Sequence, residues 1–289
     1  MSKLVVPEVV NLHITSVCNL HCTYCYAQYP EIVRPPPRCD WPKIITLLAE
    51  AGVKRVNFAG GEPTLVRDLP LLLQVARAQG LKTSIVSNGK QLTDKTIELC
   101  DAVALSLDSA DDHTNAAIGR VARGTVTGSY AVFIGLRAAR VRALGRALKI
   151  NTVVTQLNVR QDLRAMFRRL RPVKVKLLQF RQVIGENDKN AAALEVSPTE
   201  FESFVERHLE LRREGIRVQP ESADVLGSSY VMINPEGRLF QNGPNGRYLH
   251  SAPVIEIGFE AALAEVGGYD RAAFVGRGGD LDVSKWGQP

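Results

Sequence analysis

The chain has 289 residues, of which 45% are hydrophobic and 23% charged, and its formal net charge is +6. At this length it forms one large domain or two smaller ones, with enough buried surface that it needs no disulfides. No segment reaches the roughly 18 apolar residues of a membrane span, and Pro7 and Glu8 interrupt an N-terminal run too short for a signal peptide. We therefore expect a cytoplasmic protein whose five cysteines bind metal, act in catalysis or stay free.

Short β-rich runs alternate with amphipathic helical stretches along most of the chain. The expected strands cover 9–15, 55–60, 82–89, 102–108, 148–155 and 173–180. The expected helices cover 41–51, 67–79, 93–99, 128–145, 160–170 and the stretch from Ser197 to about Arg213. Gly52 follows the first of these helices, where a left-handed C-cap is wanted. Six strand–helix units indicate an α/β fold in which helices surround a parallel sheet.

Three cysteines follow the first expected strand at the spacing C-x3-C-x2-C, and they are Cys18, Cys22 and Cys25. Three thiolates on one short loop can bind a single [4Fe–4S] cluster and leave one iron open to a substrate or cofactor. A zinc site is the alternative, with His21 or His13 as a fourth ligand. Cys39 and Cys100 have no comparable spacing, so we expect both to be free or packed thiols.

Polar and basic residues recur at every second position on four of the expected strands, so each pair shares one face of its strand. The pairs are Asn11 and His13, Arg55 and Asn57, Lys149 and Asn151, and Lys174 and Lys176. Buried cations beside a void are costly, whereas a triphosphate with about four negative charges would pair with them. The face that these residues share therefore predicts a site for a polyphosphate.

The segment from Arg120 to Arg181 contains 15 Lys or Arg and a single acid, Asp162. Such a basic segment suggests an anionic partner. Several of its arginines lie in helical stretches and are expected to cover a solvated face: Arg137, Arg140, Arg146, Arg164, Arg168 and Arg171. A non-enzymatic, nucleic-acid-binding module is the alternative, but few aromatic residues accompany these cations.

With Tyr24 before the third cysteine and Gly60-Gly61-Glu62-Pro63 after the second strand, the chain resembles the radical S-adenosylmethionine enzymes. The resemblance implies a partial (β/α)6 TIM-like barrel of the radical S-adenosylmethionine type. It also implies a [4Fe–4S] cluster on the three cysteines, with S-adenosylmethionine bound at the open iron. By the same resemblance Tyr24 lies near the adenine, and Gly61 and Glu62 meet the methionyl amino group. The residue types suit this, because a carboxylate pairs with an ammonium and glycines allow close backbone approach.

Further segments are similar to those of the viperin family, in the same order, over about residues 9–285. They include NLHITSVCNLHCTYCYA, RVNFAGGEP, SIVSNG, LKINTVVTQLNV, PVKVKLLQF and SSYVMINPEGRLFQNG. The resemblance implies abstraction of the ribose 4′ hydrogen of a nucleoside triphosphate, then loss of the 3′ hydroxyl as water. The implied product is a 3′-deoxy-3′,4′-didehydro nucleotide, an antiviral chain terminator, with CTP as the first choice of substrate and UTP or GTP as alternatives.

The resemblance also implies the residues of the site. On the cofactor side it implies Tyr24, Gly60, Gly61, Glu62, Ser87, Ser106 and Arg120. For the phosphates it implies Arg55, Lys149, Lys174 and Lys176, and for further substrate contacts Asn11, His13 and Asn151. At Arg55 viperins have lysine, and arginine keeps the charge while changing its geometry. The sequence FQNG at 240–243 departs from the family where the base is expected, so the choice of base is not carried over.

We expect the barrel to cover 1–215 and a C-terminal extension over the active site to cover 216–289. The extension reads as a hairpin around Pro235-Glu236-Gly237, a short helix near 258–266 and a Gly-rich tail. The tail from Val275 to Lys285 is expected to close as a lid, since Arg277-Gly278-Gly279 combines a cation with a flexible backbone.

The resemblance implies a monomer that uses a nucleoside triphosphate and an electron donor such as flavodoxin or ferredoxin, and that binds neither polynucleotide nor membrane. Two features of animal viperins are not matched, the membrane-binding N-terminal helix and the terminal Trp, which suits a prokaryotic member. A radical S-adenosylmethionine cyclase or maturase of the molybdenum-cofactor or peptide-modifying type is the alternative enzyme. Many of those carry further cysteines near the C-terminus, and this chain has none after Cys100.

Overall fold

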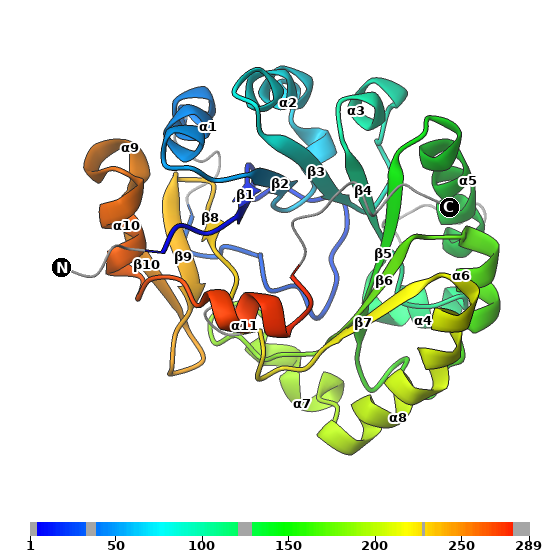
Figure 1. The fold of residues 1–289 in the computed structure, drawn as a ribbon. Coiled ribbons are helices and arrows are strands. Elements are labelled where there is room, and N and C mark those ends of the chain that lie inside the picture. The colour runs from blue at the N-terminus through cyan, green and yellow to red at the C-terminus, as the bar shows by residue number, and fades with distance from the viewer. Residues whose placement is uncertain (1–4, 33–38, 121–128, 227–228, 280–289) are drawn as a thin grey trace.

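The computed structural model describes residues 5–32, 39–120, 129–226 and 229–279. Its main feature is one curved sheet whose strands run in the order β10-β9-β8-β1-β2-β3-β4-β5-β6-β7 (Figure 1). Seven strands in chain order pair in parallel. They are β1 (Val9–His13), β2 (Arg55–Ala59), β3 (Lys82–Ser87), β4 (Ala102–Ser106), β5 (Ala147–Val154), β6 (Lys174–Gln179) and β7 (Arg217–Glu221).

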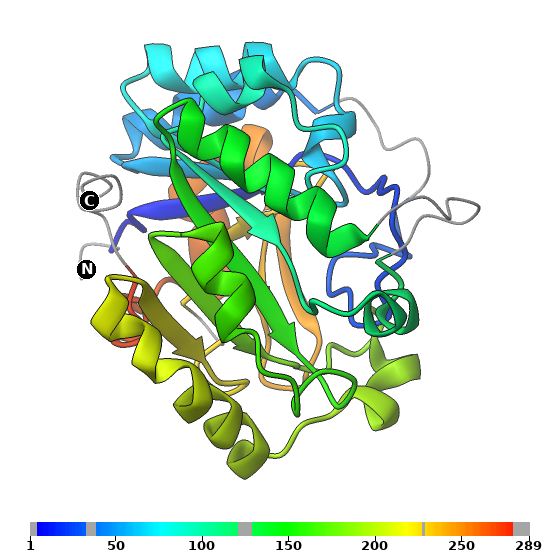
Figure 2. The same ribbon diagram turned by 90° about the vertical axis from the view of Figure 1, so that its right-hand side faces the viewer.

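Helices cover the outer face of this sheet, which leaves its inner face for the site (Figures 1 and 2). They are α1 (Trp41–Glu50), α2 (Leu69–Ala78), α3 (Asp94–Glu98), α4 (Asp112–Ile118), α5 (Tyr130–Ala143), α6 (Arg164–Leu170) and α8 (Pro198–His208). Shorter helical segments are η1 (Pro63–Leu65), η2 (Asp188–Asn190), α7 (Ala191–Leu194) and η3 (Leu209–Glu214). The expected α/β barrel with external helices is confirmed.

Local signals explain where the helices begin and end. In α8, Ser197 accepts a hydrogen bond from the backbone of Glu200, whose carboxylate in turn accepts one from the Ser197 backbone. After α1, Gly52 has a φ of 95°, a left-handed conformation that glycine adopts without strain. Helix α1 buries Ile44, Ile45 and Leu48 on one face, against the sheet.

The structure contains several short elements that the sequence did not indicate, and two of them bear on the barrel. A short helix, α4, precedes the expected helix α5, and the sequence did not indicate it because its seven residues are too few for a periodic pattern. Asp111 begins it by accepting a hydrogen bond from Thr114 N at 2.7 Å. The stretch after residue 216 forms β7, which continues the parallel sheet beside β6. The division into two domains at this point stays a prediction.

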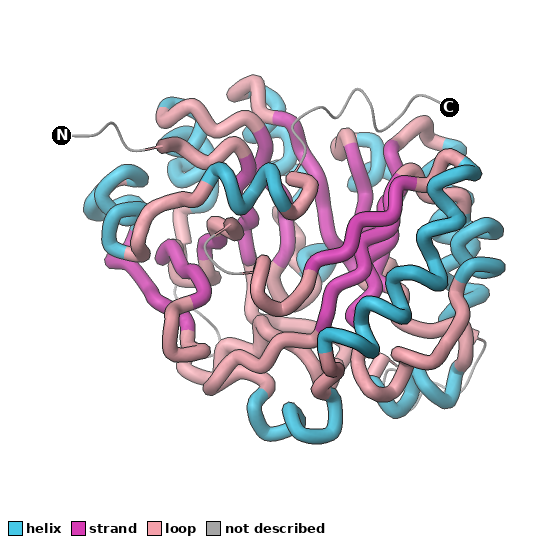
Figure 3. Tube along the Cα trace, turned by 60° about the horizontal axis from the view of Figure 1, so that its bottom comes forward, coloured by secondary structure: helices cyan, strands magenta, loops and turns pink. Residues whose placement is uncertain are grey.

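The C-terminal part closes one side of the barrel. Strand β8 (Met232–Ile233) pairs in parallel with β1 and antiparallel with β9 (Arg238–Asn242), which pairs with β10 (Tyr248–Pro253). This confirms the expected hairpin, whose turn Asn234 stabilises by accepting hydrogen bonds from the backbone of Glu236 and Arg238. After α9 (Val254–Ile257) and α10 (Phe259–Glu265), α11 (Arg271–Gly276) lies between the edge strands β10 and β7 (Figures 1 and 3).

Candidate active site

The cysteine loop directly follows β1 and is held on two sides. On one side, Thr23 N donates to the carbonyl oxygen of Ile118 at 2.8 Å, so the end of α4 supports the loop. On the other side, the Asn187 amide donates to the carbonyl oxygen of Tyr24 at 2.9 Å. Asn187 is fully enclosed and belongs to the segment that follows β6. Two elements remote in sequence therefore fix the course of this loop.

The three thiols are half-buried and close enough to influence one another. Burial above all, together with the charge of Cys22, raises the pKa of Cys18 to about 11 and that of Cys25 to about 12. Within the described ranges, no three His, Cys, Asp or Glu side chains converge on a single point as a metal site requires. Three thiols on one loop nevertheless suit the chemistry of an iron–sulfur cluster, whose ligation by these residues stays a prediction.

The turn after β2 packs on the stretch that leads into the cysteine loop. Gly61 N donates to the carbonyl oxygen of Thr15 at 2.7 Å, and Glu62 N donates to that of Val17 at 2.8 Å. A Cβ atom on Gly61 would lie 2.2 Å from the Val17 oxygen, and one on Gly60 would lie 2.5 Å from the Thr15 oxygen. The two glycines are therefore required for this backbone contact, a role that the sequence did not reveal.

Glu62 lies in this turn, and its buried carboxylate is held by neighbouring residues. It accepts hydrogen bonds from Ser87 Oγ and Asn88 N, each at 2.8 Å, and from the hydroxyl of Thr64 at 2.6 Å. Two of the predicted cofactor residues, Glu62 and Ser87, are thus brought together at the carboxyl ends of β2 and β3. The hydrogen bonds fix the orientation of the carboxylate.

Tyr24 and Arg120 belong to a second buried group, around Asp108. The Tyr24 hydroxyl donates to Asp108 Oδ2 at 2.6 Å, and Arg120 donates to both the same carboxylate and the Tyr24 hydroxyl. The other oxygen of Asp108 accepts from Val153 N at 2.8 Å. Sequence reasoning missed Asp108, because it is one of three acids that follow β4 and its neighbours are distant in the chain.

A cavity of about 280 Å³ opens on the inner face of the sheet, beside this group. Tyr24, Ser106 and Arg120 line its cofactor side. Six of the seven predicted substrate residues line it as well: Asn11, Arg55, Lys149, Asn151, Lys174 and Lys176. The strand register places Lys149 beside Lys174 and Asn151 beside Lys176. The period-two pattern therefore predicted correctly that these residues share one face of the sheet, while their contact with a substrate stays a prediction.

The cations of the cavity wall are buried, or half-buried in the case of Lys149, and they repel one another. Burial, and then the charges of Lys176, Lys174 and Arg55, hold the pKa of Lys149 well below its usual range. Lys149 and Lys174 lie near the amino ends of β5 and β6, whereas Ser87 and Ser106 end β3 and β4. The cation end and the cofactor side are thus at opposite ends of the strands.

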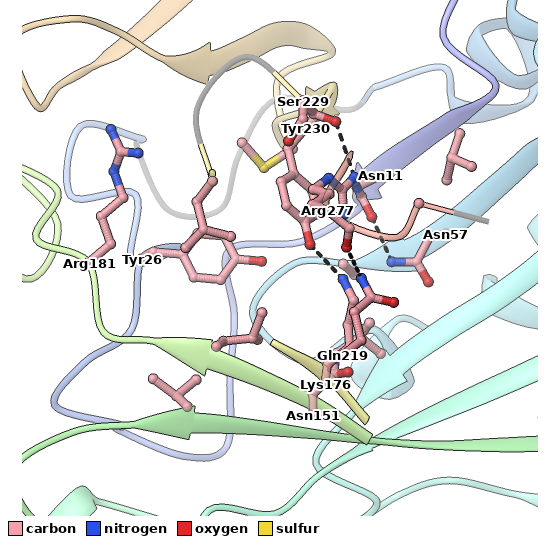
Figure 4. A pocket seen from close by; sticks show the side chains of 18 of the residues that line it. Asn11, Tyr26, Asn57, Asn151, Lys176, Arg181, Gln219, Ser229, Tyr230 and Arg277 are labelled. Atoms are coloured by element: carbon pink, nitrogen blue, oxygen red, sulfur yellow. Dashed lines mark hydrogen bonds between the residues drawn. The ribbon is translucent and has the colours of Figure 1, made fainter. Parts of the chain in front are cut away.

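Glu221 balances part of this charge, and sequence reasoning missed it. Its fully buried carboxylate lies 2.5 Å from Lys176 Nζ and 3.2 Å from a guanidinium nitrogen of Arg277, and it accepts a hydrogen bond from the Tyr230 hydroxyl. Figure 4 shows these three partners in the cavity wall, with Lys176 hydrogen-bonded to Tyr230. Burial alone would raise the pKa of Glu221, but these two cations outweigh it and hold that pKa at about 2. Gln219 donates to the same carboxylate at 2.7 Å.

Arg277 comes from the predicted lid and lies in the cavity wall with Gly278 and Gly279. Its guanidinium carbon lies 3.7 Å from the centre of the Tyr230 ring, and Gln219 donates to its carbonyl oxygen at 2.6 Å. The end of the predicted lid, residues 280–285, lies outside the described residues. Closure of the lid therefore stays a prediction.

His13 is the predicted substrate residue that the structure does not place on the cavity wall. It is buried in an aromatic cluster with Tyr26, Tyr29 and Phe240, and one ring nitrogen makes a hydrogen bond with the Tyr29 hydroxyl. Burial lowers the pKa of His13 to about 3, so the ring is neutral. His13 follows Asn11 on the same face of β1, but the rings of Tyr26, Tyr29 and Phe240 surround it.

Comparison of this chain with known proteins agrees with the geometry of the site. The model of the Radical SAM superfamily matches residues 12–127. The chain is 31% identical to the S-adenosylmethionine-dependent nucleotide dehydratase of Flammeovirga pacifica, over 96% of this chain and 98% of the relative. It is 34% identical to that of Lacinutrix mariniflava over 93% of this chain, but spans only 57% of that relative's length. The chain belongs to the S-adenosylmethionine-dependent nucleotide dehydratases, the viperin family. It is therefore a radical S-adenosylmethionine enzyme.

Solved radical S-adenosylmethionine structures share the fold of this family member. SuiB of Streptococcus suis bound to S-adenosylmethionine superposes with a TM-score of 0.65 at 19% identity, over 81% of this chain and 59% of SuiB. The enzyme anSMEcpe with bound AdoMet gives a TM-score of 0.58 at 16% identity, over 80% of this chain and 73% of anSMEcpe. In the described part of the dehydratase chain, no helix is both long and apolar enough to cross a bilayer.

The basic segment of this dehydratase divides into two parts. Lys149, Lys174 and Lys176 face the cavity, while arginines on its helices pair with carboxylates at the surface. Arg140 of α5 binds Asp94, and Arg168 of α6 binds Glu210 and Glu214. These pairs support the expectation of a solvated face for the helix arginines.

Proposed function

We propose that this chain converts a nucleoside triphosphate to its 3′-deoxy-3′,4′-didehydro analogue, with CTP as the first choice of substrate and UTP or GTP as alternatives. The observation that carries the proposal is the charge at the cation end of the cavity, apart from Arg120 on the cofactor side and Arg181 at the other end. The cations at this end are Arg55, Lys149, Lys174, Lys176 and Arg277, and the carboxylate beside them is Glu221. When all are ionised, five cations and one acid give 5 − 1 = +4. A triphosphate, with about four negative charges, matches this value.

The order of residues along the strands supports an orientation for the nucleotide. With its phosphates among the cations near the amino ends of β5 and β6, its sugar extends toward the carboxyl ends. Midway along the sheet, the Asn57 amide donates to Asn11 Oδ1 at 2.7 Å, and Asn151 lies beside Ser106, which ends β4. The 4′ position of the sugar then faces the side of Tyr24, Glu62 and Arg120.

The residues of this chain bind the substrate, orient it and exclude water. When bound, a [4Fe–4S] cluster on Cys18, Cys22 and Cys25 and S-adenosylmethionine supply the 5′-deoxyadenosyl radical that removes the 4′ hydrogen. The cavity wall then shields the sugar while its 3′ hydroxyl takes up one proton and leaves as water. An electron donor such as flavodoxin or ferredoxin supplies two electrons in all, one for the cleavage of S-adenosylmethionine and one for the sugar once the water has left. The product would act as an antiviral chain terminator for polymerases.

Anaerobic reconstitution with S-adenosylmethionine, a reductant and each triphosphate in turn tests the proposal. We expect 5′-deoxyadenosine together with a nucleotide lighter than its substrate by one water, both measured by mass spectrometry. If 5′-deoxyadenosine forms at the same slow rate with and without every triphosphate, the proposed function is wrong.

Lysine variants test the placement of the phosphates. Lys174→Ala and Lys176→Ala should each weaken triphosphate binding by about 1.5–3 kcal/mol, roughly ten- to a hundredfold, because each removes a charged contact in a buried site. Binding of S-adenosylmethionine should stay nearly unchanged. Lys82→Ala is the matched control, because Lys82 begins β3 of the same sheet but its side chain is exposed. Parental affinity in both cavity variants would contradict this placement.

A further inference from the structure

The cavity has a second end, chemically different from the cation end. Tyr26, Tyr248, Asn242 and Arg181 belong to its wall. Figure 4 shows Tyr26 and Arg181 on the side of the cavity away from Lys176 and Arg277. Two aromatic rings with one amide and one guanidinium are a surface suited to a planar heterocycle that carries hydrogen-bonding groups.

The backbone holds these side chains in place. The Tyr248 hydroxyl donates to the carbonyl oxygen of Tyr26 at 2.9 Å, and Tyr248 lies beside Asn242 in the pairing of β10 with β9. The Asn242 amide nitrogen donates to the carbonyl oxygen of Leu226 at 2.7 Å, so its Oδ1 points away from that carbonyl. Arg181 donates from one terminal nitrogen to the carbonyl oxygen of Ala223 at 2.9 Å. Both polar side chains are therefore oriented before a ligand arrives.

The cation end cannot distinguish one nucleoside triphosphate from another, because all of them carry the same phosphates. Discrimination must come from the base, and the base extends from the sugar in the direction away from the phosphates. Arginine offers only donors, so Arg181 can bind an acceptor and has nothing to accept the hydrogens of an amino group.

We propose that Arg181 and Asn242 read the base and that Arg181 selects bases carrying a carbonyl oxygen. This inference rests on the proposed function and narrows its substrate class. Arg181 donates to a carbonyl oxygen of cytosine, uracil or guanine, Asn242 makes a second hydrogen bond to the base edge, and Tyr26 or Tyr248 contacts the ring. Adenine accepts hydrogen bonds only at ring nitrogens and carries an amino group where guanine has its carbonyl oxygen, so it is the base that the site disfavours.

Arg181→Met tests the proposal, because methionine keeps much of the side-chain length and removes every donor. Affinities for CTP, UTP, GTP and ATP are measured by calorimetry on the reconstituted enzyme, and kcat/KM is measured for each in parallel. We expect the parent to bind at least one carbonyl-bearing triphosphate about tenfold or more tightly than ATP, and Arg181→Met to reduce that ratio about tenfold. Inorganic triphosphate should bind both proteins equally. Asn242→Ala should also change the ratio.

Arg140→Met is the matched control, because Arg140 pairs with Asp94 on the outer face of the barrel. An unchanged ratio in Arg181→Met, or an equal loss of affinity for all four nucleotides in that variant, would overturn the inference. An unchanged ratio in Asn242→Ala would show that Asn242 does not read the base. The binding ratio does not require turnover. An enzyme that binds with base preference but forms no dehydrated product would refute the proposed function and leave the base-reading site in place.

Discussion

Glu221→Gln tests how the cation end of the cavity is held together when no nucleotide is bound. The carboxylate is fully buried and contacts Lys176, Arg277, Tyr230 and Gln219. Glutamine keeps the shape of the side chain and removes its charge. Lys176 and Arg277 then remain buried beside the other cations of the wall, without the anion that both contact.

The size of the effect follows from the burial of these groups. Removing one partner of a buried ion pair costs about 3–5 kcal/mol, because an uncompensated charge is left in a poorly solvated site. We expect a loss of about 3 kcal/mol in the free energy of unfolding, the lower end of this range, since the glutamine oxygen can still accept a hydrogen bond. For a chain of this size, about 3 kcal/mol corresponds to a fall of roughly 6–12 °C in Tm.

Thermal unfolding with and without a nucleoside triphosphate measures this effect. The triphosphate supplies the anion that the variant lacks, so it should raise the Tm of Glu221→Gln more than that of the parent. Glu214→Gln is the control, because Glu214 pairs with Arg168 at the exposed surface and its loss should change Tm little. If Glu221→Gln is as stable as the parent, or if the triphosphate stabilises both proteins equally, the reasoning is wrong.

Three further predictions concern the loop, the turn and the pH dependence. Alanine at Cys18, Cys22 or Cys25 should abolish iron binding, measured by iron analysis and electron paramagnetic resonance. Alanine at Cys39 or Cys100 should leave iron binding unchanged. Gly61→Ala should lower Tm and cluster content, because its Cβ would overlap a backbone oxygen, whereas Gly276→Ala has open space and should change neither. The pKa of Lys149 is lower in the folded protein than in the unfolded chain, so between these two pKa values the unfolded chain binds more protons. The free energy of unfolding should therefore increase as the pH rises toward the usual lysine pKa. A bound triphosphate raises that pKa, so binding should take up a proton and weaken with rising pH; calorimetry in buffers of different ionisation enthalpy should detect this uptake in the parent and find it reduced in Lys149→Met.

Most of the fold could be predicted because its signals are local. Strands and helices follow from hydrophobic periods of two and 3.6 residues, and their ends follow from caps such as Ser197 with Glu200 or the left-handed Gly52. The cysteine spacing and the Gly-Gly-Glu-Pro turn are equally local. Helix α4 escaped prediction because it is too short for a period to be recognised.

The cavity wall was partly predictable for the same reason. Residues two apart on a strand share a face, so Lys149 with Asn151 and Lys174 with Lys176 could be assigned to one surface without knowledge of the fold. All four side chains line the same cavity in the structure, as the pattern predicts. The pattern carries no information about what covers a residue, which is why His13 was assigned to the cavity and lies instead under Tyr26 and Phe240.

Only the tertiary structure decided which groups meet. Glu221 contacts Arg277 across 56 positions of the chain, and Tyr24 contacts Asp108 across 84. The sequence determined that this chain carries a cluster motif and a face lined with cations, because each depends on spacing within a short segment. The tertiary structure decided that a buried carboxylate holds those cations, and that Arg181 and Asn242 lie at the other end of the same cavity. Such pairings depend on strand order and on the direction of side chains from separate elements, and neither is encoded in any one segment.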